Sequence, residues 1–369
     1  MSQDVELDRV TMRFGEVTAV RDVSLTIRAG EFFSFLGPSG CGKTTILRLI
    51  SGFMEPSGGA VRIGGRDMRG IGPNRRPTAL IFQNLALFPL MTVAENIGFG
   101  LEVRGIGAAE RRRRVDALLD LVALPEAGRK KVSELSGGQR QRIAIARALA
   151  VEPSVLLLDE PLSALDLKLR QHMRAELRAI QRRTGVTFIY ITHDQGEALT
   201  MSDRIGVMSG GVLEQVGDAR SLYDAPETAF VASFVGENNR FPGTVAQLDG
   251  GMAALDTPFG RLVGRNPRGV RQGERAILFV RPERLAPAGN PPAGAPPAGN
   301  VVESRVTHQD FEGAFVNTFL EGTGSGPIVV QTPHTGAPPP VPADGPARLR
   351  FEAADAIVLP AGGLADERG

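Results

Sequence analysis

Eight consecutive residues near the start of the chain have the spacing of a phosphate-binding loop. A glycine, four further residues and then glycine, lysine and threonine give the segment Gly37, Pro38, Ser39, Gly40, Cys41, Gly42, Lys43 and Thr44. Small residues bring backbone N–H groups close to phosphate oxygens, and the N-terminus of the following helix, which includes Thr45, favours an anion. Lys43 can reach the outer phosphates, and the hydroxyl of Thr44 is a ligand that Mg²⁺ accepts. The segment predicts a nucleoside triphosphate site with Mg²⁺; a chance match is the alternative.

A second chemical signal is an apolar run from 155 to 158 that ends in the carboxylates of Asp159 and Glu160. Such a run is typical of a buried parallel strand, and burying charge is costly unless the charge is used. Ligands of open α/β sheets bind outside the carboxyl ends of the strands. Chain order suggests that this strand runs beside the one that leads into the phosphate loop. We expect Asp159 to hold the Mg²⁺ shell through water and Glu160 to face the γ-phosphate across a water; an ordinary acidic loop is the alternative.

Two further polar residues follow strand-like runs. His193 comes after the β-branched run from 186 to 192, and Gln83 comes after the run from 78 to 82. Because parallel strands end at one edge of a sheet, we expect His193 to touch the γ-phosphate or the attacking water. We expect Gln83 to coordinate Mg²⁺ or that water. A satisfied structural histidine and a surface glutamine are the alternatives.

The segment Leu135 to Gln139 opens a helix predicted for residues 140–150. Ser136 is placed as its N-cap. Gly137 and Gly138 would each cost up to about 1 kcal/mol relative to alanine inside a helix, and a cap alone does not explain them. This cost predicts a second helix N-terminus that contacts phosphate. The phosphate loop 37–44 does not need this second helix N-terminus within its own chain. We therefore expect a composite site in which two copies of the chain contact the same nucleotide.

The elements that must position these residues alternate between strand and helix up to about residue 235. Strand candidates end at Leu36, Phe82, Leu158 and Thr192, which predicts parallel strands joined by crossover helices. Residues 92–152 are interpreted as a helical insertion without strands. The basic run 111–114 within it is expected to be a solvated face, with a basic contact surface as the alternative.

Residues 236–369 are interpreted as a second, β-rich domain. Short runs such as 276–280 and 315–320, separated by Gly and Pro, predict small barrels or a sandwich. Residues 286–300 contain only Ala, Pro, Gly and Asn, and residues 333–346 are also Pro-rich. Both segments are predicted to be loops or linkers without a chemical role.

Composition excludes several classes of protein. The 369-residue chain has a formal charge of +1 and 22% charged residues. The net charge is therefore too small to attract nucleic acid or an anionic membrane by overall electrostatics. No apolar run approaches the ~18 residues of a membrane span, and the N-terminus lacks a signal-peptide core. Cys41 is the only cysteine, which suits a reducing compartment; we interpret it as a small residue that fits the loop. These features predict a cytosolic protein.

Taken together, the motifs resemble those of the ATP-binding subunits of ABC transporters. The resemblance matches the loop 37–44 to Walker A, Gln83 to the Q-loop, 135–139 to the signature LSGGQ, 155–160 to Walker B, 163–166 to the D-loop and His193 to the H-loop. It covers residues 5 to about 235 and implies an α/β P-loop NTPase domain with a mixed sheet. It also implies a head-to-tail homodimer in which each ATP lies between Walker A of one copy and Ser136, Gly137, Gly138, Gln139 and Asp166 of the other.

The resemblance also implies individual roles. It makes Glu160 the general base of ATP hydrolysis and His193 the switch residue. Phe14 matches the aromatic residue that stacks on adenine, and a core role is the alternative for this side chain.

Longer phrases point to one branch of the family. Residues 82–89, 192–195 and 197–205 look like the importer branch that carries a C-terminal TOBE domain, a small all-β, OB-like fold, and the element Arg281-Pro282-Glu283 resembles a TOBE motif. Residues 166–170 and 236–241 look closest to the ATPases of spermidine/putrescine importers. Ferric-iron, phosphonate and other importers share most of these phrases and are the alternatives.

An importer ATPase of this branch implies specific partners. These are two integral membrane permease subunits and a periplasmic or extracellular solute-binding protein, with the ATPase peripheral on the cytoplasmic face of the inner membrane and no nucleic acid. A soluble ABC ATPase that acts on ribosomes or DNA and a simple phosphotransferase are the competing functions. Two positions depart from the branch: Leu90 stands where His is frequent, and Gly196 where Glu is usual.

Overall fold

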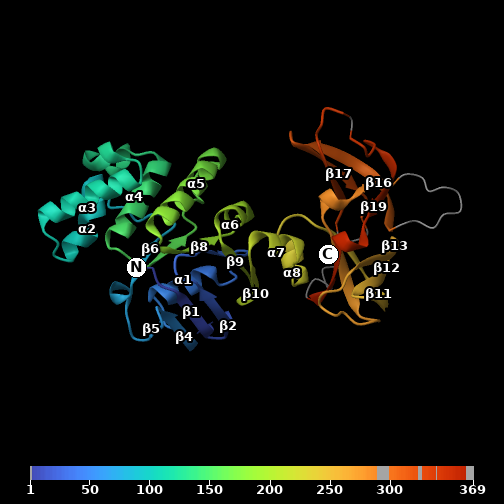
Figure 1. The fold of residues 1–369 in the computed structure, drawn as a ribbon, viewed down its shortest axis with the longest axis horizontal. Coiled ribbons are helices and arrows are strands. Elements are labelled where there is room, and N and C mark those ends of the chain that lie inside the picture. Colours follow the sequence, from blue (N-terminus) through green and yellow to red (C-terminus); the bar gives the residue numbers. More distant parts are fainter. Residues whose placement is uncertain (1, 289–298, 323–325, 338, 363–369) are drawn as a thin grey trace. The chain divides into compact units, whose positions relative to one another are not determined.

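The computed structural model describes residues 2–288, 299–322, 326–337 and 339–362 (Figure 1). The chain divides into two compact units, Met1–Ala219 and Arg220–Gly369. Each unit has its own sheets and hydrophobic core. Among the described residues, no helix combines the length and apolar character needed to cross a bilayer.

A six-stranded sheet forms the centre of the first unit, in the order β10-β9-β3-β8-β7-β6. All neighbours are parallel except β9 and β10. The strands are β3 (Phe32–Leu36), β6 (Thr78–Ile81), β7 (Val155–Asp159), β8 (Thr187–Thr192), β9 (Arg204–Ser209) and β10 (Val212–Gly217). The prediction that β7 lies beside β3 was wrong, because β8 lies between them. Chain order does not determine spatial order when crossover helices return past a neighbouring strand.

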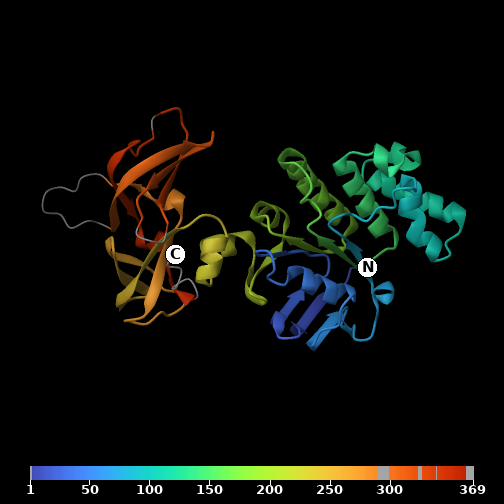
Figure 2. The same ribbon diagram turned by 180° about the vertical axis from the view of Figure 1, so that it is seen from behind.

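Both faces of this sheet are buried, which explains the continuous apolar runs of its strands. Leu156 and Leu158 point into the core on one face, with α5 (Leu167–Thr184). Val155 and Leu157 point into the core on the other face, with α1 (Lys43–Ser51). A second, antiparallel sheet covers α1; its order is β2-β1-β4-β5 and its strands are β1 (Val5–Phe14), β2 (Val17–Ile27), β4 (Gly58–Ile63) and β5 (Arg66–Asp67) (Figures 1 and 2).

The predicted helical insertion is present. It contains α2 (Val93–Val103), α3 (Ala108–Leu121) and α4 (Gly137–Ala150), with short 3₁₀ turns η2 (Pro125–Arg129) and η3 (Val132–Glu134). These helices gather beside the central sheet in Figure 1. Capping boxes begin α2 at Thr92 and α4 at Ser136, which satisfies N–H groups that a helix leaves unpaired. After α5, the short helix α6 (Gln195–Met201) joins β8 to β9, and η1 (Pro73–Arg75) precedes β6.

The second unit is built mainly from strands. A closed barrel has the order β11-β12-β13-β20-β14, and a five-stranded sheet has the order β15-β19-β16-β17-β18. The barrel strands are β11 (Asn239–Asp249), β12 (Met252–Thr257), β13 (Gly260–Arg265), β14 (Arg275–Val280) and β20 (Ala356–Pro360). The sheet strands are β15 (Ala286–Pro287), β16 (Asn300–Phe311), β17 (Phe315–Leu320), β18 (Ile328–Pro333) and β19 (Gly345–Phe351). One core joins barrel and sheet, in agreement with the predicted β-rich domain.

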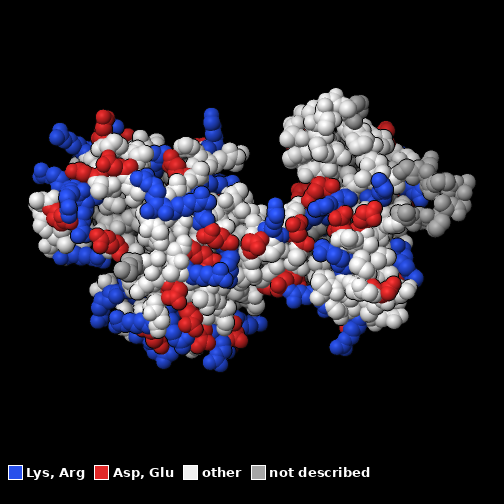
Figure 3. Space-filling model, viewed as in Figure 1, with Lys and Arg blue, Asp and Glu red and all other residues white. Residues whose placement is uncertain are grey.

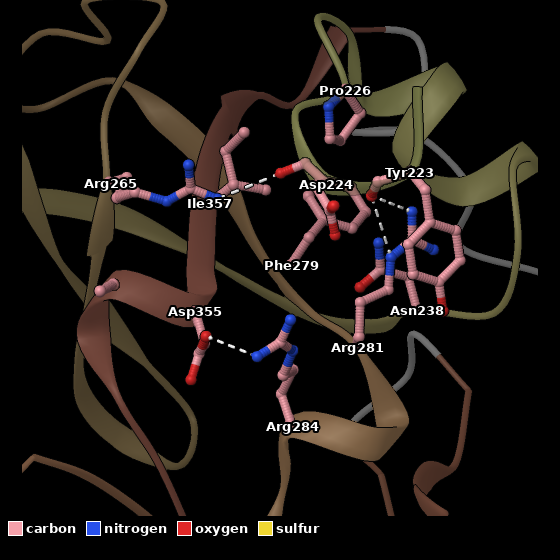
Figure 4. A pocket seen from close by; sticks show the side chains of 11 residues that line it. Tyr223, Asp224, Pro226, Asn238, Arg265, Phe279, Arg281, Arg284, Asp355 and Ile357 are labelled. Carbon is pink, nitrogen blue, oxygen red and sulfur yellow. Dashed lines mark hydrogen bonds and ion pairs between the residues drawn. The ribbon is translucent and has the colours of Figure 1, made fainter. Parts of the chain in front are cut away.

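The boundary between the units lies earlier than the predicted 235/236. Helices α7 (Ala219–Asp224) and α8 (Ala229–Phe234) group with the barrel. Ala229 and Ala232 of α8 pack against Ile277 and Phe279 of β14. Polar contacts come from Arg281, which follows β14 and is only 6% exposed. Its guanidinium donates to the Tyr223 carbonyl oxygen (2.6 Å) and lies 3.7 Å from the centre of the Tyr223 ring (Figure 4). It also donates to the carbonyl oxygens of Val235 (2.7 Å) and Glu237 (2.8 Å). These contacts and the apolar cluster together hold the preceding segment to the barrel.

The two Pro-rich segments have different outcomes. Within the predicted loop 286–300, residues 286–287 form the two-residue strand β15, Asn300 begins β16, and 289–298 lie outside the described residues. Most of the second segment connects β18, which ends at Pro333, to β19, which begins at Gly345. Two further 3₁₀ turns, η4 (Pro282–Arg284) and η5 (Ala353–Asp355), flank the barrel strands.

Candidate nucleotide and catalytic site

The phosphate loop between β3 and α1 takes its shape from glycine. Gly42 has φ +103, and a Cβ at this position would lie 2.5 Å from the Ala19 carbonyl oxygen. A Cβ on Gly37 would lie 2.3 Å from the Met208 carbonyl oxygen. Other residues would therefore force the loop open. Tight folding keeps the loop at the N-terminus of α1, where unpaired N–H groups attract anions.

The Lys43 side chain is buried beneath this loop. Its ammonium group donates to the carbonyl oxygens of Gly37 (2.7 Å) and Pro38 (2.8 Å), and it lies 3.7 Å from the Cys41 sulfur. Gly40, by contrast, has open space beside it and φ +80. The loop thus offers a cation below and accessible backbone above, which fits a polyphosphate.

Thr44 and Asp159 form the pair of oxygen ligands expected for Mg²⁺. The Thr44 hydroxyl donates to Asp159 Oδ1 at 3.3 Å. Burial, together with the neighbouring Glu160 carboxylate, raises the pKa of Asp159. Among the described residues, no cluster of three or more His, Cys, Asp or Glu could hold a metal. One hydroxyl and one carboxylate suit Mg²⁺, which keeps several waters and takes its remaining ligands from phosphate.

The raised pKa of Asp159 gives a prediction for the nucleotide-free protein. Because the folded state holds this proton more tightly than the unfolded state, the carboxylate lowers stability as the pH rises above its ordinary value. We expect Asp159→Asn to raise the unfolding temperature at neutral pH and to lose this advantage in acidic buffer. The same variant should lose the Mg²⁺-dependent stabilisation by ATP. Thermal unfolding across pH checks both expectations; an unfolding temperature below that of the wild type at neutral pH would contradict the first.

Glu160 directly follows β7 and is held in an unusual conformation. Its φ is +44, and its N–H donates to the Ile191 carbonyl oxygen at 3.1 Å. A left-handed conformation costs a non-glycine residue roughly 1–3 kcal/mol and persists only when the surroundings impose it. Here Glu160 Oε1 lies 3.2 Å from Nδ1 of His193, the first residue after β8. The structure therefore brings these two predicted site residues together.

Gln83 is connected to Glu160 through Ser163, which was not among the predicted site residues. Its side-chain amide donates to Ser163 Oγ at 3.2 Å, and this hydroxyl donates to the Glu160 carbonyl oxygen at 2.8 Å. Ser163 belongs to the D-loop motif. Its role as a bridge has no signal in the sequence, because it depends on the return of the chain after β7.

The sequence interpretation also missed the residues that anchor the His193 segment. Glu197, on α6, is only 3% exposed and accepts hydrogen bonds from Tyr190 (2.7 Å) and Thr192 (2.7 Å) of β8. Asp194 accepts from Arg170 and Arg174 of α5, both at 3.1 Å. The signal in the sequence that could have indicated this role is the carboxylate of Glu197, which stands directly before the apolar residues Ala198 and Leu199.

Gly196 sits within this network. A Cβ on Gly196 would lie 3.1 Å from Asp194 Oδ1 and 3.2 Å from Arg174 Nη1. The small size of this glycine therefore leaves room for the Arg174 guanidinium. Leu90, the other departure, is 87% exposed and is available for a contact with another protein.

The signature segment forms local hydrogen bonds at the start of α4. Ser136 caps α4 by accepting from the Gln139 N–H at 3.3 Å, and the Gln139 side chain accepts from the Ser136 N–H at 2.9 Å. Among the described residues, no hydrogen bond or ion pair joins residues 136–139 to residues 37–44. Asp166 similarly caps α5, where it accepts from the Leu169 N–H at 3.0 Å.

The two signature glycines have a packing role in addition to the predicted one. A Cβ on Gly137 would lie 3.1 Å from Leu165, and one on Gly138 would lie 3.0 Å from Leu169. The start of α4 therefore packs against the segment that holds Asp166. Phe14, at the end of β1, is 46% exposed, so its ring is accessible to a ligand.

Comparison with known proteins decides the family. A family model described as ABC transporter matches residues 20–163, and one described as TOBE domain matches residues 278–359. Spermidine/putrescine import ATP-binding protein PotA of Roseobacter denitrificans is 47% identical over 329 residues, which is 89% of each chain. The chain belongs to the ATP-binding subunits of ABC transporters. It is an ABC ATPase whose P-loop domain is followed by an all-β TOBE domain, as the sequence predicted.

Other similar proteins agree with this assignment. The protein of the same name from Rubrobacter xylanophilus is 50% identical over 330 residues, which cover 88% of this ABC ATPase and 85% of the relative. A solved dimeric ATP-binding cassette, in a post-hydrolysis state with bound ADP and Pi, has a TM-score of 0.52 and 34% identity. The match covers 58% of this chain and 99% of that chain.

Proposed function

We propose that this ABC ATPase hydrolyses ATP to energise the import of polyamines. Two observations support the proposal. The phosphate loop lies with Asp159, Glu160 and His193 at the carboxyl ends of the central strands. Two relatives, each matched over most of both chains, are named spermidine/putrescine import ATP-binding proteins. Import of ferric iron, a phosphonate or another small solute is the alternative within the same role.

The proposed nucleotide ligands follow from the geometry of the site. Residues 37–45 hold the phosphates, with Lys43 exchanging its carbonyl partners for phosphate oxygens. Phe14 stacks on adenine. Thr44, Asp159 and Gln83 hold Mg²⁺, which when bound neutralises phosphate charge. Glu160 accepts a proton from the attacking water, and His193, which contacts Glu160, orients this carboxylate and the terminal phosphate.

We propose that the complete site needs two copies of the chain. Ser136, Gly137, Gly138, Gln139 and Asp166 of one protomer contact the ATP held by the other. Among the described residues, residues 136–139 form no hydrogen bond or ion pair with the phosphate loop of the same chain, which supports this arrangement. The solved relative that is dimeric with ADP and Pi supports it further.

The remaining partners follow from the importer role. They are two integral membrane permeases and a solute-binding protein outside the membrane, with the ATPase peripheral on its cytoplasmic face. Two exposed apolar side chains, Phe82, which directly precedes Gln83, and Leu90, provide surface for a permease contact.

The experiment that tests the solute is ATPase activity of the reconstituted transporter with a panel of loaded binding proteins. We expect spermidine or putrescine to stimulate hydrolysis, and ferric iron and phosphonates to have no effect. Stimulation by another solute alone would remove the polyamine assignment while leaving the ATPase role in place.

A further inference from the structure

A second cleft lies at the opposite end of the central strands from the nucleotide site. It has a volume of about 540 Å³, and its wall includes Thr78, the first residue of β6, and Pro153, which precedes β7. The phosphate loop and Glu160 lie instead at the carboxyl ends of the strands. The cleft is therefore separate from the site described above, and its volume falls within the range of small-molecule pockets.

The charged groups of this cleft are mostly positive. Arg66, Arg75, Arg76 and Arg104 line it together with a single carboxylate, that of Glu152. Glu152 already pairs with Arg114 at 2.7 Å, outside the cleft. In the part of the chain that the structure describes, Arg66 and Arg75 have no ion-pair partner. Figure 3 shows basic side chains on both sides of a hollow between the α2–α3 helices and the segment of β5.

Arg76 makes the floor of the cleft positive as well. It is only 7% exposed and donates to the carbonyl oxygens of Leu49 (2.6 Å), Ile50 (2.8 Å), Ile71 (2.8 Å) and Met68 (3.0 Å). Leu49 and Ile50 belong to the last turn of α1, so a fixed cation caps the helix that carries Lys43 at its other end. Among the described residues, no carboxylate forms an ion pair with this guanidinium. Burial lowers its pKa, and the charges of Glu55 and Asp67 partly oppose this shift.

We propose that this cleft binds a phosphate-bearing anion at a site distinct from the nucleotide site. Arginine guanidinium groups match phosphate oxygens with paired hydrogen bonds. Arg66 and Arg75, which have no ion-pair partner among the described residues, supply the hydrogen-bond donors at the rim. Arg76, whose N–H groups already donate to four carbonyl oxygens, contributes positive charge at the floor. A cation would meet net repulsion here. The phosphate can belong to a soluble molecule or to a lipid headgroup, and the test separates these sources.

The test is titration of inorganic pyrophosphate into the full-length protein, followed by calorimetry. The nucleotide site is first filled with Mg²⁺ and a non-hydrolysable ATP analogue, so that pyrophosphate cannot enter it. We expect saturable binding that is at least about tenfold weaker in the double variant Arg66→Gln, Arg75→Gln, because two charged hydrogen-bond partners are lost. Both side chains are exposed, so the variant should fold; its unfolding temperature verifies this.

A matched control removes the same charge elsewhere. Arg112→Gln with Arg113→Gln changes two exposed positions of α3 and should keep wild-type affinity. A parallel arm measures sedimentation with phosphatidylglycerol vesicles and with phosphatidylcholine vesicles. Binding to the former alone, lost in the first variant and kept in the control, assigns the phosphate to a lipid headgroup. The proposal is overturned if neither probe binds saturably, or if both double variants bind like the wild type.

Discussion

Glu160→Gln protein, assembled with its membrane partners, is expected to hydrolyse ATP about 10²–10⁴-fold more slowly while binding it with unchanged affinity. Glutamine has the shape of glutamate but cannot take a proton from water at neutral pH. The backbone at φ +44 and the hydrogen bond to Ile191 do not depend on the carboxylate. The substituted side chain should therefore stay beside His193. Phosphate release and the binding of a fluorescent ATP analogue measure the two quantities separately.

A suitable control is Glu126→Gln, which removes the same charge from the exposed turn η2. It should leave hydrolysis at the wild-type rate. Full ATPase activity in the Glu160→Gln complex would show that another group accepts the proton. Loss of ATP binding in that variant would instead assign Glu160 a role in holding the nucleotide.

Arg281→Ala is expected to destabilise the second unit by about 3 kcal/mol or more. The substitution leaves the carbonyl oxygens of Tyr223, Val235 and Glu237 without their donor; the bond to Val235 is buried and the other two are partly buried. An unsatisfied buried group costs about 1–3 kcal/mol, and the stacking of the guanidinium on the Tyr223 ring is lost as well. For a unit of this size, the loss lowers the unfolding temperature by roughly 10 °C. Calorimetry of the full chain should show the shift in the transition of this unit, with the nucleotide-stabilised transition of the first unit unchanged.

The neighbouring Arg284 provides the control. Its ion pair with Asp355 at 3.3 Å is about half exposed and appears beside Arg281 in Figure 4. Exposed ion pairs contribute about 0–1 kcal/mol, so Arg284→Ala should shift the transition little. Equal shifts for the two variants would mean that Arg281 does not fix α7 and α8 to the barrel.

The sequence predicted closely where the four strands β3, β6, β7 and β8 end beside the candidate site. The predicted ends at Leu36 and Thr192 match β3 and β8, and β6 and β7 end within one residue of prediction. Buried parallel strands are continuous apolar runs, and polar residues that follow them are easy to detect. The contacts between Thr44 and Asp159 and between Glu160 and His193 agree with the expected convergence, although the roles of these residues stay predictions.

Features that depend on distant residues could not be predicted. The position of β8 between β3 and β7 is a property of crossover connections, and chain order gives no indication of it. The attachment of α7 and α8 to the barrel depends on an apolar cluster with β14 and β20. It also depends on Arg281, which donates to carbonyl groups more than forty residues earlier. Glu197 and Ser163 act through hydrogen bonds formed only after folding. The antiparallel sheet of β1, β2, β4 and β5 was not assigned from the sequence, although Phe14, a predicted site residue, ends β1.

The central claim is that one ATP is held between two copies of this chain. Its most direct test is a structure of the Glu160→Gln protein trapped with Mg²⁺ and ATP in the assembled transporter. The expected result is a head-to-tail dimer in which Ser136 Oγ of one protomer lies within hydrogen-bond distance of the γ-phosphate held by its partner. A closed, ATP-loaded assembly with Ser136 remote from both γ-phosphates would contradict the claim.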